Sequence, residues 1–417
     1  MLRWLALLAL ITPTLAACGT QPTPMPQSGE ARAPESRAAA TVTAADAASL
    51  AQGNAQFGGR LLGLLAHDEP SAVISPFSIS DTLAMTYAGA RGRTAAEMAN
   101  ALDFRLPADR LHGAFNALEQ ALAAIHEGST KLRIAGELFG QRGASYRQAF
   151  LSILARDYGT GIRTVDFAGS PEASRAAINA WVAEATAGKI PQLLGPGDIS
   201  SLTRLVLTDA VYLNARWDSP FRRDDTTPAT FYAPTGTTQV PTMHQTASFE
   251  YASHPGYQVL ELPYRDGRLA FDVLLPDRGG LGSLLRRMAR GGPLPLLHGL
   301  APQRVKLALP KVLLRAHFEL AEVLSKLGMR LAFSSGADLS GIAGRPGELS
   351  LQHVVHEAYV RVDEAGTEAA AATGAVVGIT ALPPVPAIQF DVNRPFVFVL
   401  RDRPTQAILF LGAVSHP

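Results

Sequence analysis

The sequence predicts an α+β fold in a single domain. Helical periodicity dominates the chain to about residue 190, and alternating strand patterns dominate the rest. Helices first and strands later favour an α+β arrangement over alternating βαβ units. Hydrophobic residues form 47% and charged residues 18% of the 417 residues, which is enough for a large core. Because 37 basic residues balance 36 acidic ones, no bulk charge points to a nucleic-acid partner.

The N-terminus has the pattern of a bacterial lipoprotein signal over residues 1–17. Arg3 precedes an apolar run at 4–11, and the small residues before Cys18 suit cleavage at that cysteine. Cys18 is the only cysteine, so it has no partner for an internal disulfide. We therefore expect a lipid on Cys18 that holds the protein on a membrane. A glycine directly after the cysteine, here Gly19, resembles the pattern of lipoproteins passed to the outer membrane, so we expect the protein there, facing the periplasm or the exterior. The alternative is an ordinary secretory signal with an incidental cysteine.

Residues 18–43 are expected to be the lipidated cysteine and a disordered tether, and residues 44–417 the folded domain. The tether contains Pro22, Pro24, Pro26 and Pro34 and no aromatic residue, so it has little to bury in a core.

A first helix is expected to begin near Ala44, where apolar residues recur at helical spacing from Leu50 to Leu65. Further helices are expected over residues 82–90, 95–102, 110–127, 146–158, 171–186 and 318–327, the last ending at Gly328. Strands are expected over residues 202–213, 239–243, 249–251, 257–262, 269–275, 305–309, 351–363, 395–400 and 407–413. The glycine and proline clusters at 279–282 and 291–302 are expected to be surface loops.

Residues 364–380 carry most of the functional information. An alternating strand pattern at 356–363 leads into a run of alanine, glycine and threonine. Side chains this small hold a segment weakly to a core, yet they fit between two existing strands without a clash. A segment that can lie outside or inside a sheet is a conformational switch. An alanine-rich helix or linker is the alternative, but Gly374, Gly378 and Pro383 interrupt a helix.

The string EAGTEAAAATGAVV from Glu364 resembles the hinge and reactive loop of inhibitory serpins. Other strings match the same family in the same order from about residue 50 to the end: SPFSIS at 75–80, VLTDAVYL at 206–213, LELPY at 260–264, LGM at 327–329 and NRPF at 393–396. The resemblance implies one domain with three β-sheets, about nine helices and an exposed reactive loop at about 364–387.

The resemblance also implies a suicide inhibitor of serine proteases. The protease would cleave the loop, form a covalent acyl complex, and be trapped as the freed segment inserts into the main sheet. Counting sixteen residues from Glu364 places the reactive bond at Thr380-Ala381, with Ile379 and Leu382 as alternatives. Because these side chains are small or aliphatic, elastase-like or subtilisin-like proteases are the expected targets.

Three further groups of residues follow from the resemblance. The hinge consists of Glu364, Gly366, Thr367, Glu368, Ala369, Ala370, Ala371, Ala372 and Thr373. A gate cluster, where the main sheet opens, consists of Ser75, Ser78, Asp209 and His356, and an upper-sheet group of Lys311, Glu364 and Trp217. Asp209 replaces the asparagine usual in the family, so we expect a charged Asp209–His356 pair.

Motifs of catalysis are missing from the sequence. No serine lies in a Gly-x-Ser-x-Gly elbow, no serine is followed three residues later by lysine, and His356-Glu357 has no second histidine at zinc spacing. We therefore expect no enzyme activity, no cofactor, no metal and no nucleic-acid partner, and a monomer. The second hypothesis for function is a non-inhibitory serpin that serves as a binding or structural protein.

Overall fold

The computed structural model describes residues 29–69, 71–126, 130–265, 267–367 and 386–417. The signal peptide, Cys18, the hinge beyond Thr367 and the residues of the reactive bond lie outside the described residues.

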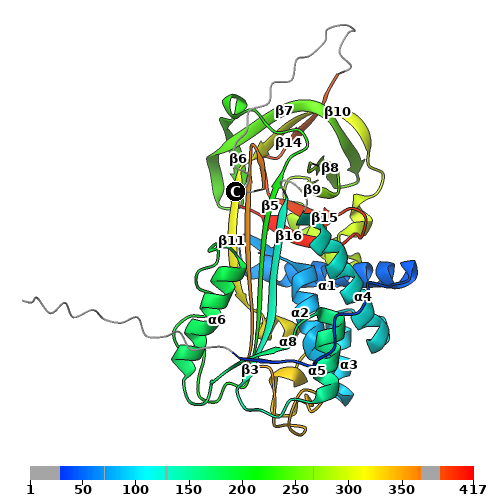
Figure 1. The fold of residues 1–417 in the computed structure, drawn as a ribbon. Helices are drawn as coiled ribbons and strands as arrows, with labels where there is room; N and C mark the ends of the chain where they lie inside the picture. The colour runs from blue at the N-terminus through cyan, green and yellow to red at the C-terminus, as the bar shows by residue number, and fades with distance from the viewer. Residues whose placement is uncertain (1–28, 70, 127–129, 266, 368–385) are drawn as a thin grey trace, which may run out of the picture.

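The main sheet has seven strands and forms the long axis of the molecule (Figure 1). Its order across the sheet is β1 (Gly29–Ala31), β4 (Ile162–Val165), β3 (Lys131–Gln141), β5 (Leu205–Arg216), β13 (Gly366–Thr367), β12 (His353–Asp363) and β11 (Val312–Glu319). The two-residue strand β13 lies between the upper ends of β5 and β12, and below it these two long strands pair directly with each other.

A second, bent sheet contains nine strands. Its path runs β14 (Ile388–Asp391), β10 (Ala301–Pro310), β7 (Gly236–His254), β8 (Tyr257–Pro263), β9 (Leu269–Pro276), β15 (Phe396–Asp402), β16 (Ile408–Val414) and β2 (Ala72–Ile74), with β6 (Thr227–Ala233) beside β7. The 19-residue strand β7 pairs with β6 over residues 236–242, with β10 over residues 242–251 and with β8 over residues 250–254. Two of the three expected sheets are thus joined through one continuous strand.

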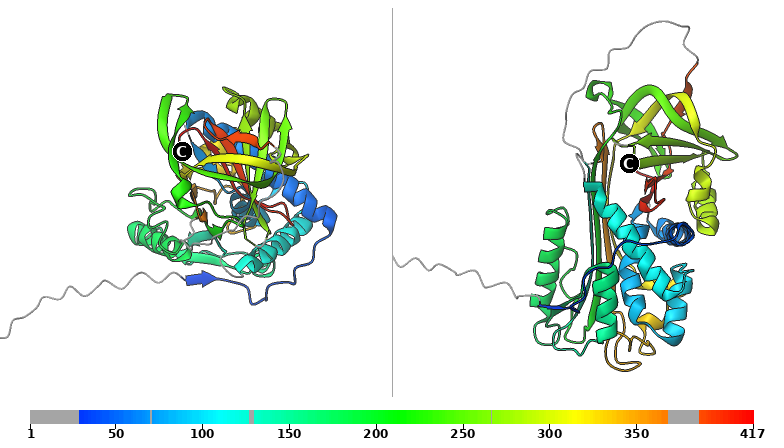
Figure 2. Two further views of the ribbon diagram at one scale, coloured as in Figure 1. Left: turned by 90° about the horizontal axis from the view of Figure 1, so that it is seen from above. Right: turned by 45° about the vertical axis from the view of Figure 1, so that its right-hand side comes forward.

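The described residues form eight α-helices, where about nine were expected. They are α1 (Ala44–Asp68), α2 (Pro76–Gly89), α3 (Gly92–Ala101), α4 (Ala108–Ala123), α5 (Gln148–Ile153), α6 (Pro171–Ala185), α7 (Leu281–Gly291) and α8 (Ala321–Lys326). Figure 2 shows α6 on one side of the main sheet and the helices α1 to α5 on the other. The predicted mixed α+β architecture is confirmed.

Apolar side chains fill both faces of the main sheet. The larger core cluster includes Phe77 of α2 and Leu207 of β5, and continues through the second sheet. A smaller cluster lies under α6, where Ile178 and Val182 pack with Phe139 of β3. Both faces of the central strands are therefore buried, as expected for a sheet whose strands read as continuous apolar runs.

Several elements differ from the sequence prediction. Strands β3 and β4 lie in the half that was expected to be helical, and α7 occupies a region between the expected loops. The expected helix at 146–158 is split, because α5 ends at Ile153 and a π-helical turn covers Leu154–Tyr158. Residues 29–43, expected to be part of a disordered tether, are ordered from β1 onward, because they bind the folded domain.

Candidate functional site

The start of the hinge is already part of the main sheet. Gly366 pairs with Asp363 of β12 and Arg216 of β5, and Thr367 pairs with Val362 and Ala215. Gly366 has φ +148°, and a Cβ there would lie 2.0 Å from the Ala215 carbonyl oxygen, so only glycine fits. The strand enters the sheet in a position from which it could extend downward.

Thr367 is held by a buried hydroxyl pair. Its side chain is fully buried, and its Oγ1 lies 2.5 Å from the hydroxyl oxygen of Tyr264. Tyr264 stacks on Trp217 with ring centroids 4.5 Å apart. The Trp217 indole Nε1 in turn donates to the Asp363 carbonyl oxygen at 2.9 Å. Burial raises the pKa of Tyr264, so this residue stays a neutral hydroxyl.

Glu364 forms an ion pair above β13. Lys311 Nζ lies 2.9 and 3.1 Å from the two carboxylate oxygens, and Thr226 Oγ1 donates to Oε1 at 2.9 Å. Burial raises the pKa of the Glu364 carboxyl, but the hydrogen bonds from Lys311 and Thr226 outweigh it, so the pKa is lowered. The structure brings Lys311, Glu364 and Trp217 together as the sequence predicted.

Below β13, the strands β5 and β12 form a parallel ladder that the hinge would have to separate. Residues 206–212 of β5 pair with residues 353–359 of β12. Asp209 and His356 are directly opposite each other in this register. The expected gate residues therefore lie in the middle of the closed part of the sheet.

The four gate residues form one buried hydrogen-bonded cluster. His356 Nδ1 lies 2.8 Å from Asp209 Oδ2, and the Ser78 hydroxyl donates to the other carboxylate oxygen. The Ser75 backbone amide donates to His356 Nε2 at 3.2 Å. Ser75 Oγ also caps α2 by accepting from the Ser78 amide at 3.3 Å.

These contacts correct the expectation of an ionised Asp209–His356 pair. Because Nε2 accepts a hydrogen bond from the Ser75 amide, it carries no proton, and the single ring proton lies on Nδ1 and points to Asp209. The imidazole is therefore neutral, with a carboxylate as its acceptor. The orientation of the His356 ring is set by the Ser75 amide at the N-terminus of α2. The sequence around Asp209 contains no information about this contact.

Tyr264 and Thr226 were not assigned a role from the sequence. Tyr264 ends the LELPY string, so a signal was present, but the string does not show that the side chain meets the hinge. Thr226 lies just before β6 in a stretch without a motif. Both contacts come from parts of the chain far from residue 364 in sequence.

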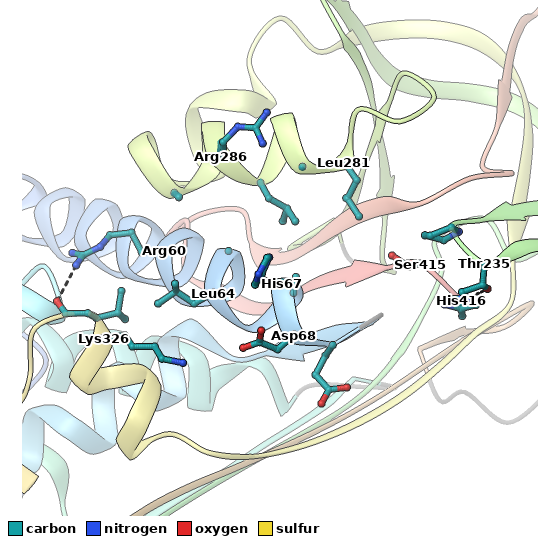
Figure 3. A pocket seen from close by; sticks show the side chains of 18 residues that line it. Arg60, Leu64, His67, Asp68, Thr235, Leu281, Arg286, Lys326, Ser415 and His416 are labelled. Carbon is teal, nitrogen blue, oxygen red and sulfur yellow. Dashed lines mark hydrogen bonds between the residues drawn. The ribbon is translucent and has the colours of Figure 1, made fainter.

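The described residues show no metal-binding group of three His, Cys, Asp or Glu side chains. In the same ranges, no helix has both the length and the apolar character needed to cross a membrane. A pocket lies between the end of α1, α7 and the C-terminal residues Ser415 and His416 (Figure 3). Neither the described hinge residues, up to Thr367, nor the gate residues line it.

Comparison with known proteins identifies the same family along nearly the whole domain. A family model described as serpin (serine protease inhibitor) matches residues 52–417. An uncharacterized serpin-like protein of Thermococcus kodakarensis is 40% identical and aligns with 85% of this chain and 82% of its own length. A leukocyte elastase inhibitor of Bos taurus is 39% identical over 88% of this chain and 99% of its own. The crystal structure of Serpin48, described as a highly specific serpin of the insect Tenebrio molitor, has a TM-score of 0.77 at 32% identity, covering 89% of this chain and 98% of that one.

Proposed function

We propose that this chain, which belongs to the serpin family, inhibits serine proteases as a suicide substrate. A target protease would attack the reactive loop and form an acyl-enzyme. The loop segment freed by cleavage would then insert between β5 and β12, and the attached protease would be carried along and distorted before water can release it. The observation that carries this proposal is β13, which has already entered the sheet with its first two residues.

The strand directions favour further insertion. At present β5 and β12 form a parallel ladder, whereas β13 is antiparallel to both of them. Extending β13 would replace one parallel ladder by two antiparallel ones, and antiparallel pairing is slightly more stable per residue. A gain of about a dozen net hydrogen bonds at roughly 1 kcal/mol each corresponds to about 10 kcal/mol.

The distance involved is large enough to deform a protease. Sixteen residues at about 3.3 Å each give an inserted strand of roughly 50 Å. Insertion must also move β5 and β12 from about 4.8 Å apart to about twice that spacing. The 2.8 Å contact between His356 and Asp209 must then break, so the gate cluster is proposed to control when the sheet opens.

The target preference follows from the proposed reactive bond. Thr380, or Ile379 or Ala381 if the bond is Ile379-Thr380 or Ala381-Leu382, would enter an S1 pocket that accepts small or aliphatic side chains. A trypsin-like pocket would leave its buried carboxylate unpaired, which is unfavourable. The similarity to leukocyte elastase inhibitors supports an elastase-like or subtilisin-like target.

We further propose that a lipid on Cys18 holds the inhibitor on the cell envelope. The support is the lipoprotein-like signal that ends at the only cysteine of the chain. Mass spectrometry of the protein purified from membranes tests this: a diacylglyceryl adduct on Cys18 is expected, and a free thiol or cleavage elsewhere contradicts it.

Incubation with an elastase-like serine protease tests inhibition. We expect a complex that survives boiling in detergent, together with a released C-terminal peptide whose mass gives the reactive bond. Cleavage of the loop with full protease activity remaining would instead assign the chain to the non-inhibitory serpins that bind or support other proteins.

A further inference from the structure

The segment that precedes the domain is bound along its side. Gly29–Ala31 of β1 pair antiparallel with residues 162–164 of β4, so the main sheet gains an edge strand. Ala33 is buried, and the Ala38 amide donates to the Arg156 carbonyl oxygen at 2.8 Å. We call residues 29–43 the strap.

The surface under the strap is shaped to receive it. A Cβ on Gly161 would lie 2.4 Å from the Ala31 carbonyl oxygen, and one on Gly159 would lie 2.9 Å from Arg37 Cδ. Gly159 also has φ +67°, which L side chains rarely adopt. The Gln120 side chain of α4 donates to the Ala38 carbonyl oxygen at 3.0 Å. Contacts from α4, β4 and the turn at Gly159 therefore meet on the strap.

Arg37 is the residue by which the strap reaches an acidic pair. Its Nε donates to Asn116 Oδ1 at 2.8 Å, and its Nη2 lies 2.5 Å from Glu119 Oε2. The Asp81 carboxyl group on α2 is buried close to Glu119, and each of these two carboxyl groups affects the pKa of the other. Two carboxyl groups in contact need a shared proton or a nearby cation, and Arg37 is such a cation.

The acidic pair lies next to the gate cluster. Asp81 follows Ser78 by three residues on α2, and Ser78 is the residue that donates to Asp209. Burial is the main cause that raises the pKa of Asp81, Glu119 and Asp209 add to it, and Arg37 opposes it. Negative charge on Asp209 and positive charge on Arg37 therefore have opposite effects on the pKa of the Asp81 carboxyl group.

Other titratable groups also face this pair. The buried Tyr158 lies within the electrostatic reach of both carboxyl groups, and Asp157 is beside it. His112 of α4 is hydrogen-bonded to Tyr158 at 2.7 Å, and burial lowers its pKa to about 4. His112 is thus neutral near pH 7, and among these groups Arg37 supplies the positive charge.

We propose that the strap keeps the main sheet closed and that Arg37 is its positioning residue, because Arg37 compensates the Asp81–Glu119 pair behind the gate. The functional meaning of this inference rests on the proposed insertion mechanism. Detachment of the strap would leave two contacting carboxyl groups without their cation, three residues from the serine that holds Asp209. The junction between the proposed membrane tether and the domain would thereby influence how readily the sheet opens.

Hydrogen–deuterium exchange of the full chain, followed on peptides from β5 and β12, measures sheet opening directly. Arg37→Gln should speed exchange about tenfold, because the partly buried Glu119 carboxylate loses its cation. Arg37→Lys should retain most of the protection. Arg37→Gln combined with Glu119→Gln should return close to the parent rate, since no uncompensated carboxyl pair remains. Arg32→Gln is the matched control, because Arg32 belongs to the strap but makes only an exposed contact with Glu30, and should change nothing.

The pH profile separates charge compensation from simple docking. In Arg37→Gln the pair must keep a proton, so the excess of exchange over the parent should grow from pH 5 to pH 8 as that proton is lost. Exchange equal to the parent, or a pH-independent excess that Glu119→Gln does not remove, would overturn the proposal. Protease trapping by the parent is measured in parallel. A parent that traps protease while Arg37→Gln exchanges normally refutes the strap alone, and a parent that fails to trap refutes the proposed function.

Discussion

Thr367→Arg should convert the inhibitor into a substrate. Thr367 is fully buried between Ala215 and Val362, and its hydroxyl contacts only a neutral partner, Tyr264. A guanidinium at this position brings five donors and a charge into a site with no carboxylate among these neighbours. The segment must either leave the sheet or bury an unpaired charge, and both outcomes oppose insertion.

The size of the effect follows from the cost of that charge. An uncompensated buried charge costs about 3 kcal/mol or more. If this cost appears in the barrier to insertion, about 3 kcal/mol slows the step by roughly 150-fold, because each 1.36 kcal/mol is a factor of ten. Hydrolysis of the acyl-enzyme would then precede insertion in most encounters. The fold itself should survive, since β13 is only two residues long and the β5–β12 ladder remains.

The assay is the stoichiometry of inhibition with an elastase-like protease, read together with detergent gels. The parent should need about one inhibitor per protease, whereas Thr367→Arg should be consumed by cleavage with little stable complex. Thr367→Ser keeps the hydroxyl contact with Tyr264 and should behave like the parent. A Thr367→Arg variant that traps protease at the parent's stoichiometry would show that insertion does not pass through this site.

Three further predictions concern the gate and the upper sheet. Asp209→Ala should speed exchange in β5 and β12, because the Ser78 hydroxyl and the His356 ring lose their shared carboxylate in the closed ladder, and unchanged exchange in both strands would contradict a role of this cluster in keeping the sheet closed. Tyr264→Phe should lower the free energy of unfolding by about 1–3 kcal/mol in urea titrations, because the buried Thr367 hydroxyl loses its partner. An unchanged midpoint and slope of the unfolding curve would be inconsistent with the contact between Tyr264 and Thr367. Lys311→Met should remove the ammonium that helps lower the pKa of Glu364. Because a carboxyl group with a lowered pKa adds stability above its unfolded pKa and loses it as the pH falls, the free energy of unfolding of the variant should be lower than that of the parent by on the order of 1 kcal/mol at pH 7, after solvent screening, and equal to it at pH 3. A difference that is unchanged between these pH values would refute the ion pair.

The sequence predicted the start of the hinge because its information is local. Gly366 and Thr367 lie between β5 and β12, and Gly366 is required by the close approach of the Ala215 carbonyl, whereas the switch role of the residues that follow stays a prediction. The positions of the gate residues came from the family resemblance. The protonation of His356 did not follow from either source, because it depends on the direction of the Ser75 amide at the start of α2.

Other differences arose from partners distant in sequence. The strap has a proline-rich neighbourhood that suggested disorder, but its order depends on β4 and on Gly159 and Gly161, about 130 residues later. Strand β3 was missed because Gly136 and Gly140 weaken its alternation; a Cβ on Gly136 would lie 2.4 Å from Thr82 Oγ1 on α2. Helix α7 could have been found, since its buried residues Leu284, Leu285 and Met288 have helical spacing within a basic stretch.

The contacts of the main sheet divide into those that hold the closed state and those that favour the inserted one. The gate cluster and Arg37 act on the closed ladder of β5 and β12, so weakening either should speed productive insertion and also spontaneous conversion without protease. Thr367 acts in the inserted strand, so Thr367→Arg should slow both processes. Arg37→Gln combined with Thr367→Arg should therefore open its sheet as readily as Arg37→Gln alone and still fail to trap protease. Because insertion is proposed to be downhill, the lifetime of the active inhibitor depends on this barrier rather than on equilibrium stability.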